Sequence, residues 1–269
     1  MTAPGDDGCP GMTGDLRQHL LDSRIAGDVA TPRAENLRNF GRMAEGWVDY
    51  DFGLVPARAW TRDEVLDVMA RRCGVHPDPA YDDGPDTIDV DLTLAALDRV
   101  RDRLALAARR RERVLVATGH PTGILVLHLE TVRALRAAGA QVLVPDLDWE
   151  WPWDEGAAGR WGARRVRAIS GVHMLATGGE LLHTHRPEPM RALLDVLDTP
   201  PDLVVADHGW AGAAAARGLE VLSYADCNDP ALFVGQEEGL ALTVVPLDDN
   251  VVPKRYDPVA AHLTGWVRS

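Results

Sequence analysis

The sequence predicts an α/β fold: an open, mostly parallel sheet flanked by helices in a Rossmann-like arrangement, preceded by a helical N-terminal region. Residues 114–118 form an apolar run typical of a strand buried on both faces. A glycine-bearing turn over 119–123 and an apolar stripe over 125–135 then predict a helix, which Gly139 ends. Apolar runs and helical segments alternate through the rest of the chain, as they do in βαβ units.

The N-terminal part of the chain is predicted to be helical. Residues 1–14 are typical of a flexible tail, 15–111 form the helical region, and 112–269 form the α/β domain. The predicted helices cover residues 15–25, 32–43, 62–73 and 90–111.

Two helix starts carry capping signals. Thr31 and Pro32 predict an N-cap followed by a proline in the first turn. Thr61 and Glu64 match a capping box, in which each residue satisfies a backbone N–H of the other.

The α/β domain contains further strands and helices. Strands after the first are predicted at residues 141–145, 165–175, 180–185, 203–206, 221–225 and 242–245. Helices are predicted from 187 to about 197, up to 218, and near 231–233.

Size and charge limit the classes of partner. The chain has 269 residues, 46% of them hydrophobic, and a net charge of −13. Nucleic acid or an anionic membrane would require a basic surface, so we expect neither partner. We find no membrane span or signal peptide, and three cysteines without metal-ligand spacing indicate a reduced, cytoplasmic protein. Whether the protein is a homo-oligomer is left open.

Polar side chains follow four of the predicted strands, where the carboxyl ends of parallel strands meet at one sheet edge. Carboxylates brought together repel each other unless they are protonated or bind a cation. Oxygen ligands suit Mg²⁺, Mn²⁺ or Ca²⁺ better than zinc, so we expect a divalent ion, Mg²⁺ or Mn²⁺. The proposed ligands are Asp207, Asp226, Asn228 and Asp249. Neighbouring polar groups are His120, Thr122, His208, Asp229, Asp248 and Asn250.

Alternative roles remain open for several of these residues. Asp207, Asp226 and Asp229 can instead be N-caps of the helices that follow them. His120 can be a turn residue that bonds to the backbone. His183 and His185, two apart on a strand, point the same way and are either metal ligands, substrate donors or a polar strand face. His173 lies in an apolar run and is expected to be a core residue.

The cluster and its surroundings predict metal-assisted hydrolysis of a phosphate ester. Lys254 is the only lysine of the chain, and with Arg255 it follows the last acidic group. These two cations can hold phosphoryl oxygens. Thr122, Gly123 and the N–H groups at the helix start can hold the same anion. The catalytic candidates are Asp226, Asp207 and His120, one of which would act as general base.

Tryptophans at alternate positions follow the second predicted strand. Trp149, Trp151 and Trp153 either form an aromatic wall over a pocket or belong to a loop that packs back onto the domain. The sequence leaves both readings open.

The chain resembles an actinobacterial family of proteins described as phosphatases, over roughly residues 15–260. The runs that carry the resemblance are IAGDVATPRAENL, DTIDVDLTLAALDR, ATGHPTG, HTHRPEPM, PDLVVADHGWAGAAAARGLE, YADCNDPALF and VPLDDNVV. The arrangement is also distantly similar to the metal-dependent damage-control phosphatases, which place Asp and Asn at strand ends around a divalent ion. The resemblance implies that Arg33 and Asn36 reach the substrate. The tryptophan-rich stretch departs from the family pattern.

We therefore expect a divalent-metal-dependent phosphatase, a phosphoric monoester hydrolase acting on a small phosphorylated metabolite. A lyase, an isomerase or a glycosyl-transferring enzyme on the same scaffold is an alternative. A nucleotide- or sugar-binding module is another. A dinucleotide-dependent dehydrogenase is not expected, because the turn after the first strand is GHPTG and does not match the G-x-G-x-x-G pattern.

Overall fold

Runs of valine, leucine and alanine form the strands of the central sheet, because such runs can be buried on both faces. The computed structural model describes residues 10–151 and 164–268. In this part of the chain the main sheet has eight strands, ordered β10-β9-β8-β3-β6-β5, with β4 beside β3 and β7 beside β6. The strands are β3 (Arg113–Thr118), β4 (Gln141–Val142), β5 (Arg164–Ile169), β6 (Val172–Thr177), β7 (Glu180–Leu182), β8 (Leu203–Asp207), β9 (Val221–Ala225) and β10 (Leu242–Pro246).

The order of the strands reverses at β3. Strands β10, β9, β8, β3 and β6 run parallel, and β5 and β7 are antiparallel to β6. Val114 of β3 pairs with Val142 of β4 on one side and with Leu203 of β8 on the other. The chain thus continues from β3 to β4 and β6 on one side of that strand and later returns to form β8 on its other side. In open α/β sheets, the crevice beyond such a reversal is where ligands bind.

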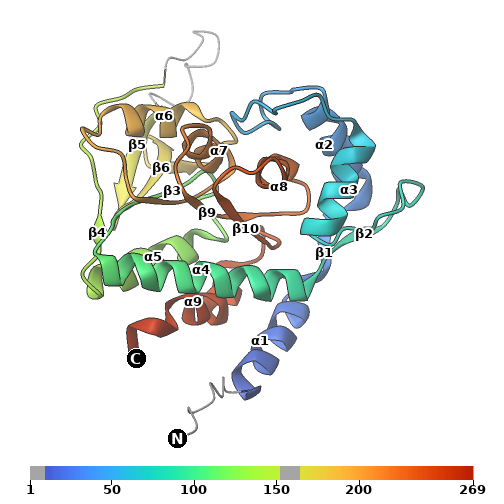
Figure 1. Cartoon of the computed structure of the whole chain (residues 1–269), viewed down its shortest axis with the longest axis horizontal. Helices are drawn as coiled ribbons and strands as arrows, with labels where there is room; N and C mark the ends of the chain where they lie inside the picture. Colours follow the sequence, from blue (N-terminus) through green and yellow to red (C-terminus); the bar gives the residue numbers. More distant parts are fainter. Residues whose placement is uncertain (1–9, 152–163, 269) are drawn as a thin grey trace, which may run out of the picture.

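Helices cover both faces of the sheet (Figure 1). On one face lie α4 (Val90–Arg110), α5 (Leu125–Ala137) and α9 (Asp257–Thr264), and on the other lie α6 (Glu188–Asp195), α7 (His208–Ala216) and α8 (Pro230–Glu237). The short segments η1 (Pro253–Tyr256) and η2 (Gly265–Arg268) flank α9. The mostly parallel sheet with helices on both faces confirms the predicted fold class.

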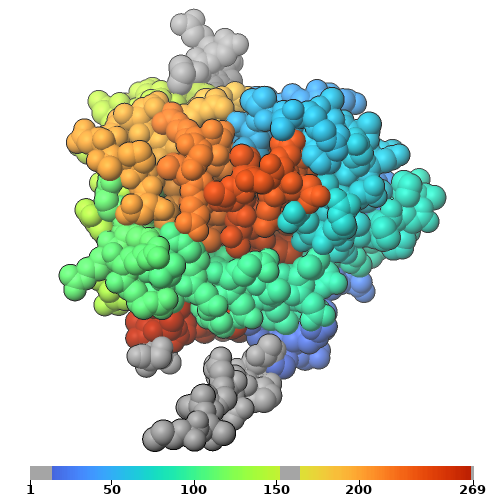
Figure 2. All heavy atoms as spheres, viewed as in Figure 1, coloured from blue at the N-terminus to red at the C-terminus, as the bar shows by residue number. Residues whose placement is uncertain are grey.

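The N-terminal region packs against the C-terminal part of the sheet domain. Figure 2 shows its blue and cyan surface in contact with the orange and red C-terminal segment. Apolar residues from both regions belong to one continuous hydrophobic core. The predicted division into two regions near Arg111 stays a prediction. The elements of this region before α4 are α1 (Pro10–Asp22), β1 (Gly27–Pro32), α2 (Arg33–Ala44), α3 (Arg62–Arg72) and β2 (Pro85–Ile88).

The prediction of an all-helical N-terminal region is wrong in one respect. β1 and β2 form a two-stranded antiparallel sheet. Thr31 lies in β1 and does not cap a helix, since Pro32 occupies the N-cap position of α2 without a side-chain bond. The hydroxyl of Thr31 instead donates to Asp226 Oδ2 at 2.8 Å. The capping box of Thr61 and Glu64 is confirmed at the start of α3.

Three strand predictions also require correction. The strand expected over 180–185 ends at Leu182, so His183 and His185 lie beyond it. The single strand expected over 165–175 is a hairpin of β5 and β6, because Ser170 and Gly171 both adopt positive φ, as a tight hairpin turn requires. The strand expected over 141–145 is shorter, since β4 ends at Val142. Among the described helices, none combines the length and hydrophobicity needed to cross a bilayer.

Candidate functional site

A cavity of about 190 Å³ lies at the edge of the sheet where the predicted polar groups converge. It is bordered by the residues that follow β3, β8, β9 and β10, by the segment after β7, and by α2. Its lining residues are Glu35, Asn39, Tyr50, His120, His183, His185, His208, Asn228, Asp229, Asp249 and Asn250. The cavity therefore lies at the reversal of strand order between β3 and β8, where the fold places ligand sites.

Asp207, the last residue of β8, organises the centre of this site. Its Oδ1 accepts hydrogen bonds from the backbone N–H groups of Gly119 and His120, at 2.7 and 3.1 Å, and from His208 Nδ1 at 2.9 Å. Its Oδ2 accepts from His128 Nε2 at 2.8 Å. Asp207 is fully buried, and these bonds, above all those from His128 and His208, overcome the effect of burial and hold its pKa well below the usual value.

His208 presents its second nitrogen to the cavity. Because Nδ1 is bonded to Asp207, Nε2 faces Asp229 Oδ2 at 3.3 Å and Asp249 Oδ2 at 3.6 Å. Burial lowers the pKa of His208, but the charge of Asp229 and the hydrogen bonds to Asp207 and Asp229 outweigh it and raise the pKa well above the usual value. His208 thus carries a proton unless a cation replaces it.

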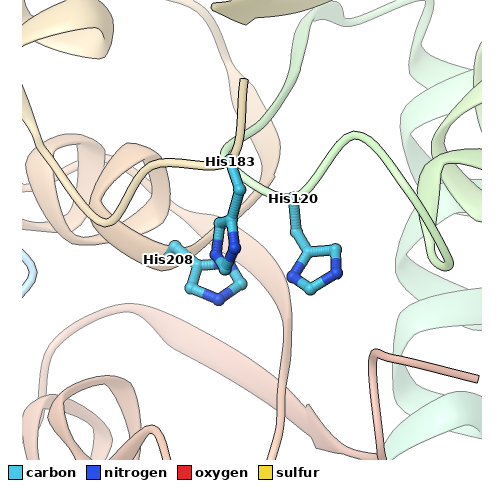
Figure 3. A group of neighbouring side chains, drawn as sticks. All are labelled: His120, His183 and His208. Carbon is cyan, nitrogen blue, oxygen red and sulfur yellow. The ribbon is translucent and has the colours of Figure 1, made fainter. Parts of the chain in front are cut away.

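Three histidines from separate segments point toward one another, as Figure 3 shows for His120, His183 and His208. One nitrogen from each lies within 4.8 Å of the other two. His185, His208 and Asp229 form a second grouping with the same spacing. His185 Nδ1 donates to the carbonyl of Asp49 at 2.8 Å, so Nε2 is the nitrogen that can accept a cation. A carbonyl or carboxylate behind an imidazole is the usual support of a metal-binding histidine.

Unlike His208, the other three imidazoles at the cavity wall are neutral near pH 7. Burial, followed by the charge of His208, lowers the pKa of His120 to about 4. Partial burial, followed by the charges of His208 and His120, lowers the pKa of His183, which is more exposed than His120, to about 3. His185 also has a lowered pKa, mainly through burial. Neutral imidazoles have the free lone pair that metal binding requires.

A third grouping consists of carboxylates at the ends of β9 and β10. One oxygen from each of Asp226, Asp248 and Asp249 lies within 4.8 Å of the others, and all three residues are buried. Burial and then the nearby Asp248 raise the pKa of Asp226 to about 7, and burial raises that of Asp249 well above the usual value. Three buried carboxyl groups with raised pKa values are expected either to hold protons or to bind a cation.

Two buried polar atoms at the boundary of these groupings lack hydrogen-bond partners within the described residues. They are Nδ1 of His120 and Oδ2 of Asp249, which lie 3.4 Å apart. Buried polar groups are rarely left unsatisfied, so these two atoms are available to hold a ligand. The donor set of imidazoles and carboxylates fits a divalent metal ion.

The structure brings Asp207, Asp226, Asn228 and Asp249 to this one edge, as expected. Asp207 and Asp229 occupy the N-cap positions of α7 and α8, yet neither side chain caps its helix. The capping role considered for these two residues is therefore absent. Imidazoles lie close to these four predicted ligands, and the alternative that His183 and His185 bind the metal stays a prediction.

The predicted substrate contacts lie elsewhere. Arg33 is fully buried, pairs with Asp86 at 2.8 Å and donates to two backbone carbonyls. Asn36 donates to the same carboxylate and to Cys227 Sγ. Neither residue borders the cavity, and their hydrogen bonds to Asp86 and Cys227 help to hold α2 in place.

The phosphate contacts expected near both ends of the α/β domain also do not line the cavity. Lys254 and Arg255 are exposed on η1, where Arg255 donates to the carbonyl of Ser23. Thr122 is exposed. Gly123 packs against backbone, since a Cβ there would lie 2.5 Å from the carbonyl oxygen of Asp249.

Other expectations concern the remaining polar and aromatic residues. His173 is a buried core residue that bonds to the carbonyl of Val116 at 3.0 Å, as expected.

Trp149 and Trp151 contact each other, pack on the core and line a separate pocket of about 550 Å³, and Trp153 lies outside the described residues. Three lining residues were not among the predicted site residues: Glu35 and Asn39, which lie in a predicted helix, and Tyr50, which follows it in a loop.

The fold and the site together define a class: an α/β protein whose mostly parallel sheet carries, where its strand order reverses, a largely buried cluster of histidines and aspartates that could hold a metal ion. The chain belongs to a protein family described as Phosphatase, whose model matches residues 12–268. It is 47% identical over 255 residues to Phosphatase SCO2771 of Streptomyces coelicolor, an alignment that covers 93% of this chain and 94% of that protein. The resemblance to a phosphatase family seen in the sequence is confirmed.

Proposed function

We propose that this protein is a divalent-metal-dependent phosphatase that hydrolyses a small phosphorylated metabolite, a phosphoric monoester. One observation carries the proposal: His120, His183 and His208, from three separate segments, direct nitrogens toward one point in the cavity. Membership of the phosphatase family supports the reaction class. The histidine–aspartate donor set supports the metal.

The donor set favours Mn²⁺ over Mg²⁺, the two ions expected from the sequence. Mg²⁺ binds oxygen ligands and keeps its water, whereas imidazole suits later divalent ions. Mn²⁺ accepts both carboxylate and imidazole ligands. We therefore propose Mn²⁺, or another transition ion of similar ligand preference, at the histidine grouping.

The residues of the chain divide into ligands and supports. We assign His208, His185 and Asp229 as ligands of the ion, and His120 and His183, which form the other grouping with His208, as additional ligands. Asp207 is a positioning residue, because its oxygens are taken up by N–H donors. A divalent ion held here supplies positive charge for phosphoryl oxygens and makes water a better nucleophile.

The cavity favours a small substrate. Its volume of about 190 Å³ is that of roughly six water molecules at about 30 Å³ each, enough for a phosphoryl group and a few further atoms. Among the described residues that line it, none is lysine or arginine. The phosphoryl charge must therefore be balanced by bound cations, and the rest of the substrate meets Glu35, Asn39 and Tyr50.

The state of the cysteines bears on the compartment in which the protein works. Cys73 and Cys227 are free and buried, which is consistent with a reducing compartment. We therefore propose that the enzyme works in the cytoplasm.

The test is a phosphate-release assay after metal removal. Protein treated with a chelator should be inactive against a panel of small phosphate esters, and Mn²⁺ should restore activity to at least one of them. His208→Gln should lower kcat/KM by more than about 100-fold, because it removes a central ligand. Asp67→Asn, an exposed carboxylate on α3, should leave the activity unchanged. Metal binding without phosphate release from any ester would contradict the proposal and favour another reaction class.

A further inference from the structure

The carboxylate grouping at the ends of β9 and β10 is separate from the histidine grouping. Asp226 follows β9, and Asp248 and Asp249 follow β10, which pairs in parallel with β9. These three residues are 0%, 3% and 1% exposed, so water screens their carboxylates poorly. In the described residues no arginine or lysine forms an ion pair with these three carboxylates, although the charge of Arg24 acts on Asp248. Three acids this close repel one another strongly when ionised.

The hydrogen bonds of the grouping hold the carboxylates in place and leave acceptor capacity. Asp226 accepts from the hydroxyl of Thr31 and from the N–H of Cys227. Asp248 accepts from the N–H of Asn250, and Asp249 Oδ1 accepts from the side-chain amide of Asn250. Each carboxylate offers about four acceptor positions, so all three retain some for a cation.

An observation outside the acidic residues also indicates a ligand. His120 is 2% exposed, and its Nδ1 has no hydrogen-bond partner among the described residues although Asp249 Oδ2 is 3.4 Å away. Asp249 Oδ2 is likewise without a partner and lies 3.6 Å from His208 Nε2. Asp249 is therefore the member of the carboxylate grouping that lies next to the histidines.

The donors exceed what one ion can use. Four histidines, His120, His183, His185 and His208, and four carboxylates, Asp226, Asp229, Asp248 and Asp249, belong to the three groupings. Transition ions in proteins commonly take four to six ligands. Two divalent ions would balance the four carboxylate charges and divide the donors into a histidine-rich and an oxygen-rich set.

We propose that Asp226, Asp248 and Asp249 hold a second divalent cation, so that the centre is dinuclear with Asp249 between the two ions. This rests on the proposed metal-dependent function and adds the number and placement of the ions. The oxygen-only donor set suits Mg²⁺, Mn²⁺ or Ca²⁺, and Mn²⁺ alone of these also suits the histidine-rich position. Paired ions at phosphatase centres typically lie about 3.5–4 Å apart and stabilise both oxygens of the displacement.

The experiment measures binding of Mn²⁺ to the full chain without substrate. Metal-free protein is titrated calorimetrically, and the bound metal is counted after gel filtration. Wild-type protein should bind two Mn²⁺ ions and show the exchange-coupled electron paramagnetic resonance spectrum of a dinuclear centre. Asp248→Asn should retain one ion and lose the coupling, and His185→Gln should retain the other.

Matched controls separate ligand loss from misfolding. Asp257→Asn changes an exposed carboxylate on α9 and should keep two ions and the coupling. Asp226→Asn gives a second test of the same position should Asp248→Asn fail to fold, as circular dichroism would reveal. Binding of one ion by wild-type protein would overturn the proposal, and so would two ions that persist in both variants. Either result is independent of whether the protein releases phosphate, because no turnover is measured.

Discussion

Asp207 Oδ1 accepts a hydrogen bond from Nδ1 of its neighbour His208 at 2.9 Å, at the junction of β8 and α7. To make this contact, His208 adopts a φ of 47°, which for a residue with a side chain costs about 1–3 kcal/mol. The surrounding bonds to Asp207 maintain this conformation. The imidazole is thereby fixed with Nε2 toward Asp229 and Asp249. The strained backbone and the orienting carboxylate together prepare one nitrogen for a ligand.

We predict that Asp207→Asn weakens Mn²⁺ binding by about 10–100-fold, the usual cost of losing a support behind a metal-binding histidine. The amide has one acceptor oxygen and no negative charge, so it can no longer accept from both His208 and His128, and it holds the orientation of His208 less firmly. Calorimetric titration measures the effect. Asp86→Asn is the matched control, because Asp86 is equally buried but pairs with Arg33 away from the cavity. It should lower stability and leave the affinity unchanged, whereas unchanged affinity in Asp207→Asn would contradict the assigned role.

Metal binding should become stronger as pH rises. His208 has a raised pKa and holds a proton at neutral pH, and the ion must displace that proton from Nε2. Below the pKa of His208 the apparent affinity should therefore rise about tenfold per pH unit for one displaced proton. His120 and His183, with pKa values of about 4 and 3, are already neutral above pH 5 and add no such dependence.

Titrations at pH 7 in two buffers of different ionisation enthalpy measure this proton release directly. Wild-type protein should release one proton through His208 in addition to those held by Asp226 and Asp249, whose pKa values are also raised, and His208→Gln should lower the total release by about one proton. An affinity independent of pH between 6 and 8 would show that His208 does not bind the ion.

The sequence allowed the convergence of the acidic groups to be predicted but not the histidine cluster. Asp207, Asp226 and Asp249 follow parallel strands, and parallel strands place their carboxyl ends at a common edge whatever the details. His183 and His185 follow β7, which is antiparallel to β6 and begins after a hairpin. The rule that parallel strands end at one edge does not place a segment that follows an antiparallel strand. The preceding hairpin of β5 and β6, which turns at Ser170 and Gly171, was not predicted either.

Arg33 illustrates a different limit. Its place in a segment shared with the family suggested contact with substrate, yet its guanidinium pairs with Asp86, distant in the sequence. Local pattern cannot reveal a buried ion pair between two such residues. The fold class was predictable because apolar periodicity is local, whereas the partner of a buried charge is a property of the packed chain.

Substrate selection should respond to charge at the cavity mouth. Glu35 borders the cavity, and in the described lining no lysine or arginine opposes it, so a substrate with a second anionic group is disfavoured. We predict that Glu35→Lys raises kcat/KM for bisphosphates relative to monophosphates by about fivefold to tenfold, equivalent to about 1 kcal/mol for a partly exposed charge. Asp67→Lys makes the same charge change on an exposed part of α3 and should leave the ratio unaltered. Equal ratios for Glu35→Lys and wild type would exclude a role of Glu35 in selection.

The close approach of Gly209 to the segment after β7 should be essential for the histidine cluster. A Cβ at this position would lie 2.0 Å from the carbonyl oxygen of His185 and 2.7 Å from the carbonyl carbon of Arg186. Both are backbone atoms, so Gly209→Ala must push the strand-end segment away from α7 and separate His185 from His208. We expect Mn²⁺ affinity to fall by more than about tenfold and stability by about 1–3 kcal/mol, as for other overpacked sites.

Gly41→Ala in α2 is the contrasting change, because a Cβ there would meet nothing within 4 Å. Alanine is the better helix former, so this variant should gain about 0.5–1 kcal/mol of stability and keep its metal affinity. Thermal unfolding and metal titration of both variants measure the two effects separately. A Gly209→Ala protein that bound Mn²⁺ as tightly as Gly41→Ala would show that His185 is not a ligand, since the displacement of its backbone carbonyl would then have no consequence for the ion.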